Sequence, residues 1–207
     1  MIIVFGNQKG GCGKTTNCIQ FANYLAYKGK NCVVLDVDFQ KSIVDRRNQD
    51  LENFDNKPLY EVIDAEMNDV AKTIADFKEI NDGHLLIDLP GRVDDEALIT
   101  ILQNADVVIV PFRYDRLTMD STALFIKIME YYKIKAKIFF LPNNIESSVK
   151  YETKEQVKEI LKEYGMITDE IPSRVIMQRL YTIDIEKKAI EVVSKAYDCI
   201  IENAGIQ

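Results

Sequence analysis

Glycines and two lysines gather near the N-terminus in the run Lys9-Gly10-Gly11-Cys12-Gly13-Lys14-Thr15-Thr16. Glycine lets backbone N–H groups turn inward around phosphate oxygens, and the start of a following helix adds partial positive charge. In such a loop Lys14 would bridge the β- and γ-phosphates of a nucleotide, and the Thr15 hydroxyl would bind Mg²⁺. The run therefore predicts a phosphate-binding loop, and the alternative is a glycine-rich turn that only reverses the chain.

Aspartates stand at the ends of two apolar runs. Asp36 and Asp38 close the run 32–38, and Asp88 follows three apolar residues. In open α/β sheets, ligands bind at the carboxyl ends of the strands, which is where these side chains would lie. Asp36 and Asp38 would share one strand face because Val37 points the other way. We expect Asp88 to serve Mg²⁺, whereas Asp36 and Asp38 could instead cap a following helix.

These groups can act together only if strands and helices alternate around them. A strand within 2–6, a helix over 14–28 and a strand over 32–38 would form a βαβ unit with a parallel pair. Further helices are predicted over 67–80, 95–104, 117–132, 151–163 and 185–202, and further strands over 85–89, 107–111 and 138–141. Residues 42–62 are polar and give no clear assignment. The alternation predicts an α/β sandwich with a mostly parallel central sheet flanked by helices.

Length and composition fit a single cytoplasmic domain. The chain has 207 residues, of which 47% are hydrophobic, so we expect one domain over 1–207. Its four cysteines lie far apart, which suggests neither a zinc site nor a disulfide framework. No apolar stretch approaches the roughly 18 residues that a membrane span needs. We therefore expect a soluble protein in a reducing cytoplasm, without a membrane partner.

The net charge limits how the chain could bind nucleic acid. A formal charge of −7 opposes a generally basic binder, so any DNA contact must come from a local patch. Lysines and glutamates interleave over 150–163. That pattern predicts i,i+4 ion pairs on a solvated helix face.

The run from Gln8 to Thr16 resembles the deviant Walker A box of the ParA/MinD family, in which a second lysine, here Lys9, opens the loop. An ordinary P-loop would have glycine where this chain has Gln8. The resemblance implies a three-layer P-loop NTPase sandwich that binds ATP and Mg²⁺. It also implies a homodimer in which Lys9 reaches the partner's phosphates, like an arginine finger supplied in trans. Otherwise Lys9 is an ordinary exposed lysine.

Further segments resemble the same family. Asp38 matches the residue that positions or activates the attacking water, although Phe39 replaces a common proline. Asp88 matches the Walker B carboxylate, and residues 88–95 match the switch region, with Gly91 in place of a frequent second proline.

Later resemblances concern the adenine base. Asn143 falls where an asparagine commonly reads adenine, with Asn144 close behind, and Pro172 falls in the segment that packs against the base. A Pro/Asn cluster could equally form a plain turn.

The resulting predictions fall into three groups. The predicted site comprises catalytic Lys9, Lys14 and Asp38; nucleotide-binding Gly10, Gly11, Cys12, Gly13, Lys14, Thr15, Thr16, Asn143 and Pro172; and metal-binding Thr15, Asp38 and Asp88.

Two branches of the family fit poorly. The iron–sulfur reductases need cysteines after the Walker B region, yet no cysteine lies between Cys32 and Cys199. MinD-like proteins end in a basic amphipathic membrane helix, whereas residues 196–207 carry two acids and no basic residue. The resemblance thus implies a short ParA-type plasmid partition ATPase that binds DNA nonspecifically and is stimulated by a centromere-binding, ParB-like protein. Such a protein would be nucleoid-associated, with candidate DNA contacts at Arg174, Arg179, Lys187 and Lys188.

Two other functions remain open. The first is an ATP-gated adaptor that positions a conjugation, secretion or polar protein complex without DNA, which the charge of −7 favours somewhat. The second is a small-molecule P-loop phosphotransferase, for which the sequence shows no acceptor pocket. Two single residues carry smaller hypotheses: modification of Cys12 would block nucleotide binding, and His84, the only histidine, would have a surface or capping role.

Overall fold

The computed structural model describes the chain from Met1 to Gln207 except for residues 39, 56, 81–82 and 92–95. In that part of the chain the strands are β1 (Ile2–Phe5), β2 (Cys32–Asp36), β3 (Glu61–Asp64), β4 (His84–Asp88), β5 (Val107–Phe112), β6 (Lys137–Pro142) and β7 (Met166–Ile167). The α-helices are α1 (Lys14–Tyr27), α2 (Ser42–Asn53), α3 (Val70–Ile80), α4 (Glu96–Asn104), α5 (Arg116–Tyr131), α6 (Lys154–Lys162) and α7 (Lys187–Ala204). Two short 3₁₀ turns are η1 (Met67–Asp69) and η2 (Val175–Gln178).

The strands form one sheet in the order β3-β2-β4-β1-β5-β6-β7, and every neighbouring pair is parallel. Strand β1 lies between β4 and β5, so the chain leaves it for one side of the sheet and later returns to build the other side. Asp88 is in register with Phe5 at the end of β1 and with Asp36 at the end of β2. The chain direction therefore brings the phosphate loop and the aspartates to one edge, at the switch point where ligands bind in such sheets.

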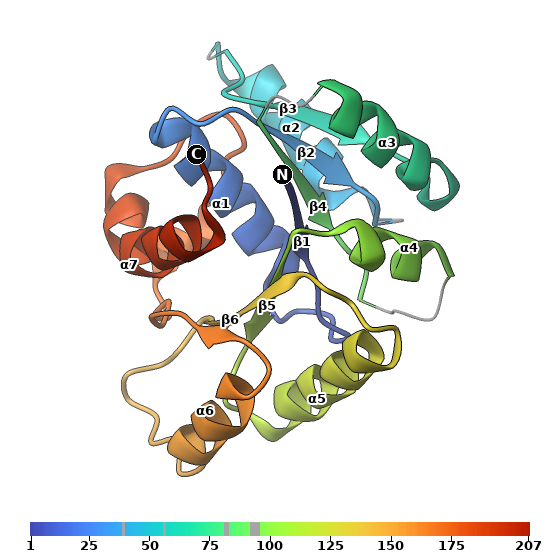
Figure 1. The fold of residues 1–207 in the computed structure, drawn as a ribbon. Coiled ribbons are helices and arrows are strands. Elements are labelled where there is room, and N and C mark those ends of the chain that lie inside the picture. The colour runs from blue at the N-terminus through green and yellow to red at the C-terminus, as the bar shows by residue number, and fades with distance from the viewer. Residues whose placement is uncertain (39, 56, 81–82, 92–95) are drawn as a thin grey trace.

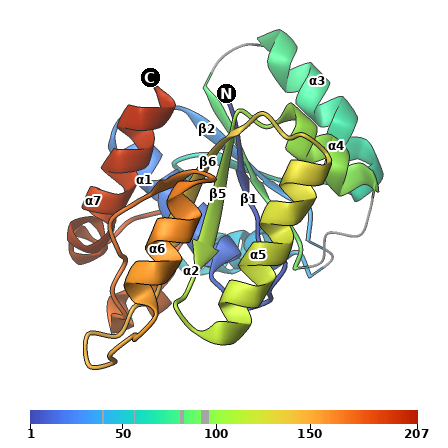
Figure 2. The same ribbon diagram turned by 60° about the horizontal axis from the view of Figure 1, so that its bottom comes forward.

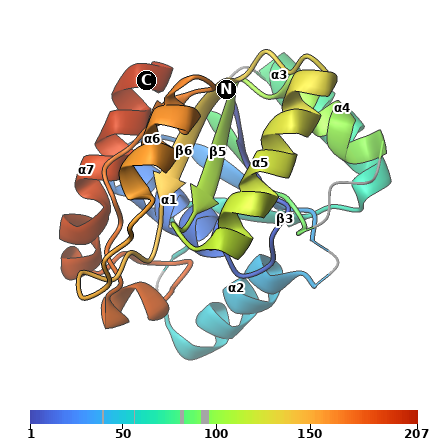
Figure 3. The ribbon, with the colours of Figure 1, turned by 90° about the horizontal axis from the view of Figure 1, so that it is seen from below.

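Helices cover both faces of the sheet, because alternate residues of each strand point to opposite sides. Ile3 and Phe5 belong to a core with α1 and α7, whereas Ile2 and Val4 belong to a core with α3, α4 and α5. The three layers can be followed in Figure 1 and, turned, in Figure 2, where α1 and α7 lie on one side of β5 and α5 on the other. Figure 3 shows the same separation of α7 from α3 and α4. The predicted α/β sandwich is confirmed.

The polar segment that gave no assignment contains α2 and β3. Helix α2 lacks a continuous apolar stripe, and its buried side chains are Ile43, Arg47 and Asp50. Arg47 donates hydrogen bonds to Thr182 Oγ1 and to the Tyr60 carbonyl, and Asp50 accepts one from the Thr182 backbone N–H. Hydrogen bonding therefore stabilises a helix that apolar periodicity does not reveal.

Two smaller expectations are wrong. His84 is 6% exposed, and its Nε2 lies 3.0 Å from the main-chain oxygen of Gln207, so of its two expected roles the one at the surface is wrong. On α6, the ion pairs within the helix are i,i+3 pairs, because Lys158 contacts Glu155 and Lys162 contacts Glu159. The predicted i,i+4 pairing is wrong, since the lysines and glutamates there do not stand four residues apart.

A membrane-spanning helix would need a long apolar segment. Within the described ranges, no helix combines the length and hydropathy that a bilayer crossing requires.

Candidate functional site

The phosphate loop connects the end of β1 to the start of α1, as strand, glycine-rich turn and helix. Gly11 has φ +77° and Gly13 has φ +98°, conformations that L-residues with a side chain rarely adopt. A Cβ at Gly13 would also collide with the Asn143 amide nitrogen. Both the backbone conformation and the lack of space therefore require glycine at position 13.

Lys14, the first residue of α1, is buried beneath this loop. Its Nζ donates a hydrogen bond of 3.1 Å to the Lys9 carbonyl. The segment after β4 comes close to the same loop, because a Cβ built at Gly91 would lie 3.4 Å from the Gly10 nitrogen and 3.8 Å from Lys14 Nζ. The ammonium group thus lies between the phosphate loop and the start of the predicted switch region. Residues 92–95 of that region lie outside the described residues.

Thr15 and Asp88 meet where α1 begins and β4 ends. The Thr15 hydroxyl donates a hydrogen bond of 2.6 Å to Asp88 Oδ2, while Asp88 Oδ1 is buried and has no hydrogen-bond partner among the described residues. The pKa of Asp88 is raised to about 7, chiefly by burial and to a smaller extent by the negative charges of Asp36 and Asp38, against the lowering effect of Thr15 and Lys14. A buried carboxylate oxygen without a partner suits a cation, and with the Thr15 hydroxyl it fits the oxygen ligands that Mg²⁺ prefers.

The two aspartates of the second strand have separate positions. Asp36 is the last residue of β2, and its carboxylate accepts the backbone N–H groups of Ile43 and Val44, so it caps the start of α2. Asp38 lies beyond the strand, partly exposed, and accepts a hydrogen bond of 3.1 Å from the Gln40 backbone. The expectation that both share a strand face is wrong because β2 ends two residues earlier. The capping alternative holds for Asp36.

Lys9 turns toward its own chain. Its Nζ lies 3.3 Å from Asp115 Oδ1 and 3.1 Å from Thr118 Oγ1, at the start of α5. It is therefore engaged within the subunit rather than extended into solvent. Neither Asp115 nor Thr118 was among the predicted site residues, since nothing in the sequence signals that the start of α5 lies beside residue 9.

A cavity of about 350 Å³ adjoins the phosphate loop. Asn143 and Pro172 both line it, and Asn143 Nδ2 donates a hydrogen bond of 3.0 Å to the Cys12 carbonyl. Two arginines that the sequence did not single out for nucleotide binding, Arg46 and Arg174, line the same cavity. Asn143 and Pro172 thus line one cavity together with Gly11 and Gly13 of the loop, and two arginines add positive charge to its lining.

Helix α7, far along the chain, is linked to the phosphate loop through Asn17 of α1. The Tyr197 hydroxyl donates a hydrogen bond of 2.9 Å to Asn17 Oδ1, and Asn17 Nδ2 donates one of 2.7 Å to the Gly13 carbonyl. Both side chains are fully buried. Neither Asn17 nor Tyr197 belongs to a motif that predicted the site, so this chain of contacts was not predicted, although buried polar side chains of this kind usually have a partner.

Cys12 lies inside the loop and is 1% exposed. Its Sγ is 3.2 Å from the Lys9 carbonyl, and burial raises its pKa, which opposes formation of the reactive thiolate. The hypothesis that modification of Cys12 blocks nucleotide binding therefore applies only if the loop opens.

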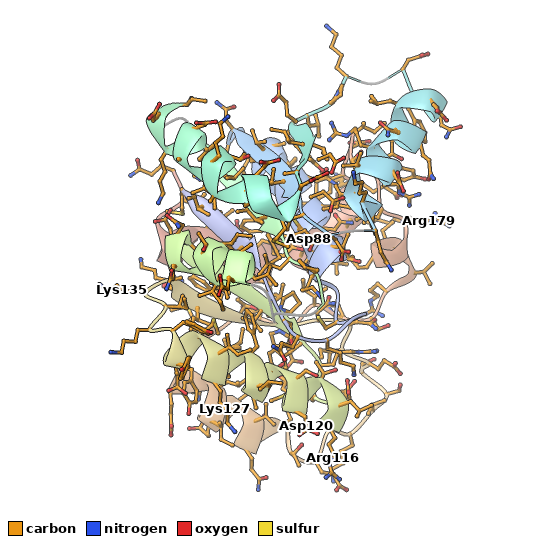
Figure 4. The ribbon with its side chains drawn as sticks, turned by 90° about the vertical axis from the view of Figure 1, so that its right-hand side faces the viewer. Asp88, Arg116, Asp120, Lys127, Lys135 and Arg179 are labelled. Atoms are coloured by element: carbon orange, nitrogen blue, oxygen red, sulfur yellow. The ribbon has the colours of Figure 1, made fainter. Side chains whose placement is uncertain are left out.

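The candidate DNA contacts lie around η2 and the start of α7. Arg174 and Arg179 flank η2 and are exposed, as are Lys187 and Lys188 in the first turn of α7. Figure 4 shows Arg179 at the rim of the molecule, well away from Arg116 and Lys127 on α5. Arg174 also lines the cavity beside the phosphate loop, so it is a candidate for nucleotide binding as well as for DNA binding.

Comparison with known proteins extends the sequence resemblance. The family model described as an AAA domain matches residues 1–93. The chromosome-partitioning ATPase Soj of Treponema pallidum (strain Nichols) is 53% identical over 38 residues, which are 18% of this chain and only 15% of the length of that relative.

Solved structures resemble the chain over nearly its whole length. A putative plasmid partition protein from Borrelia burgdorferi B31 bound to AMPPNP has a TM-score of 0.76, with 17% identity and coverage of 98% of each chain. The MinD cell division protein of Aquifex aeolicus has a TM-score of 0.75, with 18% identity and coverage of 97% of each chain. These similarities confirm the predicted three-layer P-loop NTPase fold.

Proposed function

We propose that this chain, whose phosphate loop resembles that of the ParA/MinD ATPases and whose fold is like theirs, is an ATP-dependent dimerisation switch that hydrolyses ATP to ADP and phosphate. Its proposed task is the partition of a plasmid or mobile element. The ATP-bound dimer holds DNA nonspecifically, and a ParB-like partner stimulates hydrolysis and release.

The proposal assigns a role to each group at the sheet edge. Backbone N–H groups from Gly10 to Thr16 surround the phosphates, and Lys14 leaves the Lys9 carbonyl to neutralise their charge. Thr15 and Asp88 hold Mg²⁺, which when bound neutralises charge that develops on the phosphates. Asp38, the partly exposed carboxylate, orients the attacking water and contributes to the metal site. Asn143 and Pro172 contact the adenine.

The single observation that carries the proposal is the arrangement of Thr15, Asp88 and Lys14. A hydroxyl, a carboxylate with a partnerless buried oxygen and a buried ammonium group surround the mouth of one glycine-rich loop. These groups suit a metal-bound polyphosphate: among the described residues the buried Asp88 Oδ1 has no hydrogen-bond partner, which Mg²⁺ would provide, and the phosphates would give Lys14 an anionic partner.

Size-exclusion chromatography with light scattering tests the switch. The protein is run without nucleotide, with ADP and with ATP, each with Mg²⁺, alongside the variants Asp38→Ala and Lys9→Ala. We expect monomer without nucleotide and with ADP, a dimer with ATP that Asp38→Ala makes persistent, and no dimer for Lys9→Ala. If the wild-type protein binds ATP yet stays monomeric, the proposed dimerisation switch is wrong.

DNA binding is tested separately by co-sedimentation of the ATP-bound Asp38→Ala variant with DNA. If binding uses about four phosphate contacts, affinity should fall roughly 100-fold between 50 and 200 mM salt. Replacement of Arg179 and Lys187 by glutamine should reduce both the affinity and the salt dependence. No retention at low salt would exclude the DNA branch and leave the ATPase switch intact.

A second candidate is the ATP-gated adaptor that positions a protein complex without DNA. The net charge of −7 favours it, and so does the outer face of α5, where Leu117, Leu124 and Tyr131 are exposed at seven-residue spacing. Residues seven apart lie on the same side of a helix, so these side chains form a stripe. A pull-down that depends on ATP but not on DNA would support this candidate.

A further inference from the structure

The Lys9 side chain is bound within its own subunit at the start of α5. Its Nζ contacts Asp115 Oδ1 at 3.3 Å and Thr118 Oγ1 at 3.1 Å, and the side chains of Lys9 and Asp115 are 30% and 41% exposed. Residues 9 and 115 are far apart in sequence, so the fold itself creates this contact. The proposed function gives Lys9 a different position, across a dimer interface.

The acceptors of Lys9 are fixed independently of it. Asp115 is the N-cap of α5 and accepts the Thr118 backbone N–H at 2.9 Å, while the Thr118 hydroxyl donates to Asp115 Oδ2 at 2.8 Å. Thr118 is fully buried. Burial raises the pKa of Asp115, but hydrogen bonds from Thr118 and Lys9 outweigh it and hold the pKa below its usual value. Thr118 therefore orients the carboxylate independently of Lys9, and the carboxylate is ionised where Lys9 contacts it.

The backbone of Lys9 is engaged as well. Its carbonyl accepts hydrogen bonds from Lys14 Nζ at 3.1 Å and from Cys12 Sγ at 3.2 Å. When Lys14 turns to a bound nucleotide, this carbonyl loses its charged donor, while the Lys9 side chain keeps its contact with Asp115. Nucleotide binding thus frees the Lys9 carbonyl from Lys14, whereas the Lys9 ammonium group leaves Asp115 only in a separate step.

We infer that Asp115, together with Thr118, is a positioning residue that holds Lys9 within its own subunit and so opposes the ATP-dependent dimer. This inference rests on the proposed function, in which Lys9 acts on the partner's nucleotide. One ammonium group cannot occupy both positions, so each subunit gives up its Lys9–Asp115 contact when the dimer forms. Asp115 sets the protein concentration at which ATP produces a dimer.

The expected size of the effect follows from the exposure of the pair. Partly exposed ion pairs shift an equilibrium by about two- to five-fold. Because a dimer releases two lysines, loss of the contact should tighten the monomer–dimer equilibrium by roughly the square of that factor, about four- to 25-fold.

The test measures the dimer dissociation constant by analytical ultracentrifugation, with Mg²⁺ and a non-hydrolysable ATP analogue. The main variant is Asp115→Asn, because asparagine caps a helix about as well as aspartate and only the charge is lost. Asp115→Ser is a second variant with a neutral capping side chain. The matched control is Asp120→Asn, which removes the same charge one turn further along α5 from an exposed side chain, labelled in Figure 4.

We expect Asp115→Asn and Asp115→Ser to lower the dissociation constant about four- to 25-fold and Asp120→Asn to leave it unchanged. Without nucleotide, Asp115→Asn and Asp115→Ser should shift the unfolding equilibrium by no more than the about two- to five-fold that the Lys9 contact contributes, and Asp120→Asn should leave it nearly unchanged. A larger loss of stability would report a lost helix cap. A dissociation constant that is unchanged in Asp115→Asn, or lowered equally by Asp120→Asn, overturns the inference.

A double-mutant cycle on the nucleotide-free monomer examines the contact itself. Lys9→Ala and Asp115→Asn should show non-additive effects on unfolding, whereas Lys9→Ala and Asp120→Asn should add. Additivity in the first cycle would overturn the inference even where the dimer forms as proposed. A wild-type chain that never dimerises would instead overturn the proposed function, so the two failures are distinguishable.

Discussion

Thr15 Oγ1 lies 2.6 Å from Asp88 Oδ2, so the first turn of α1 is hydrogen-bonded directly to the end of β4. The other oxygen of this carboxylate is buried with no partner in the described part of the chain, and Asp88 is 1% exposed. The nucleotide-free protein therefore retains a desolvated acid at its centre, which costs stability and is favourable only when a cation is bound.

Replacement of Asp88 should have opposite effects on ATP binding and on the stability of the nucleotide-free protein. Asp88→Asn is expected to weaken Mg²⁺-dependent ATP binding by at least about 10-fold, because even indirect partners of a metal site contribute that much. Isothermal titration calorimetry with and without EDTA measures this loss. Equal ATP affinity in the variant and the wild type would remove Asp88 from the metal site.

The same variant should be the more stable one without nucleotide. The pKa of Asp88 is raised to about 7 in the folded chain, above its unfolded value, so ionisation of the folded form is penalised. The cost grows as the pH rises from about 4, the unfolded value, to about 7, and is constant above that. We expect urea unfolding in EDTA to show Asp88→Asn more stable than the wild type at pH 8, with the difference vanishing near pH 4.

Gly13 and Gly10 form a matched pair within the phosphate loop. Alanine at position 13 would need φ +98° and would collide with Asn143, whereas a Cβ at Gly10 meets nothing within 4 Å. Gly13→Ala should lower the free energy of unfolding by about 1–3 kcal/mol, and Gly10→Ala should leave it nearly unchanged. Chemical denaturation of the nucleotide-free proteins decides this, and equal losses would show that steric requirements at position 13 are relaxed.

Cysteine reactivity should follow burial. Cys12, Cys18 and Cys32 are buried, and only Cys199 is partly exposed among the four. A maleimide should therefore modify Cys199 first, and the other three only as the chain unfolds. Mass spectrometry gives the order, and ATP binding of the singly modified protein should be normal. Early loss of ATP binding together with modification of Cys12 would show that the loop opens readily.

His84 should make stability depend on pH. Burial lowers its pKa in the folded chain, although the main-chain oxygen of Gln207 favours the protonated ring. Between the unfolded value of about 6.5 and the lower folded value, the unfolded chain binds more protons, so the free energy of unfolding falls as the pH falls below about 6.5. The variant His84→Leu should lack this component, which the difference between the two unfolding curves at pH 7 and pH 5.5 isolates. If the wild type and His84→Leu lose the same free energy of unfolding between pH 7 and pH 5.5, His84 does not cause the pH dependence.

Sequence patterns revealed the parts of this molecule that depend on local chemistry. Glycine and lysine spacing predicted the loop, and apolar runs predicted the strands around it, because both signals are contained in a few consecutive residues. Helix α2 was missed since its buried face carries Arg47 and Asp50, whose partner Thr182 is distant in sequence.

The same limit applies within the candidate site. The loop residues, Asn143 and Pro172 were named from motifs, and the fold places Asn143 and Pro172 around one cavity with Gly11, Gly13 and Thr16 of the loop. Arg46 and Asp115 belong to no sequence motif. They could not be predicted, because only the order of the strands in the sheet places α2 and the start of α5 beside the loop. Whether any of these residues contacts nucleotide stays a prediction.

The hydrogen bonds from Tyr197 through Asn17 to Gly13 have a practical consequence for anyone who alters the far end of this chain. Helix α7 lies on the outside of the molecule, yet one of its hydroxyl groups steadies the amide that supports the turn around the phosphates. A deletion, tag or crosslink that shifts this helix should therefore weaken nucleotide binding, although the sequence of the loop is unchanged.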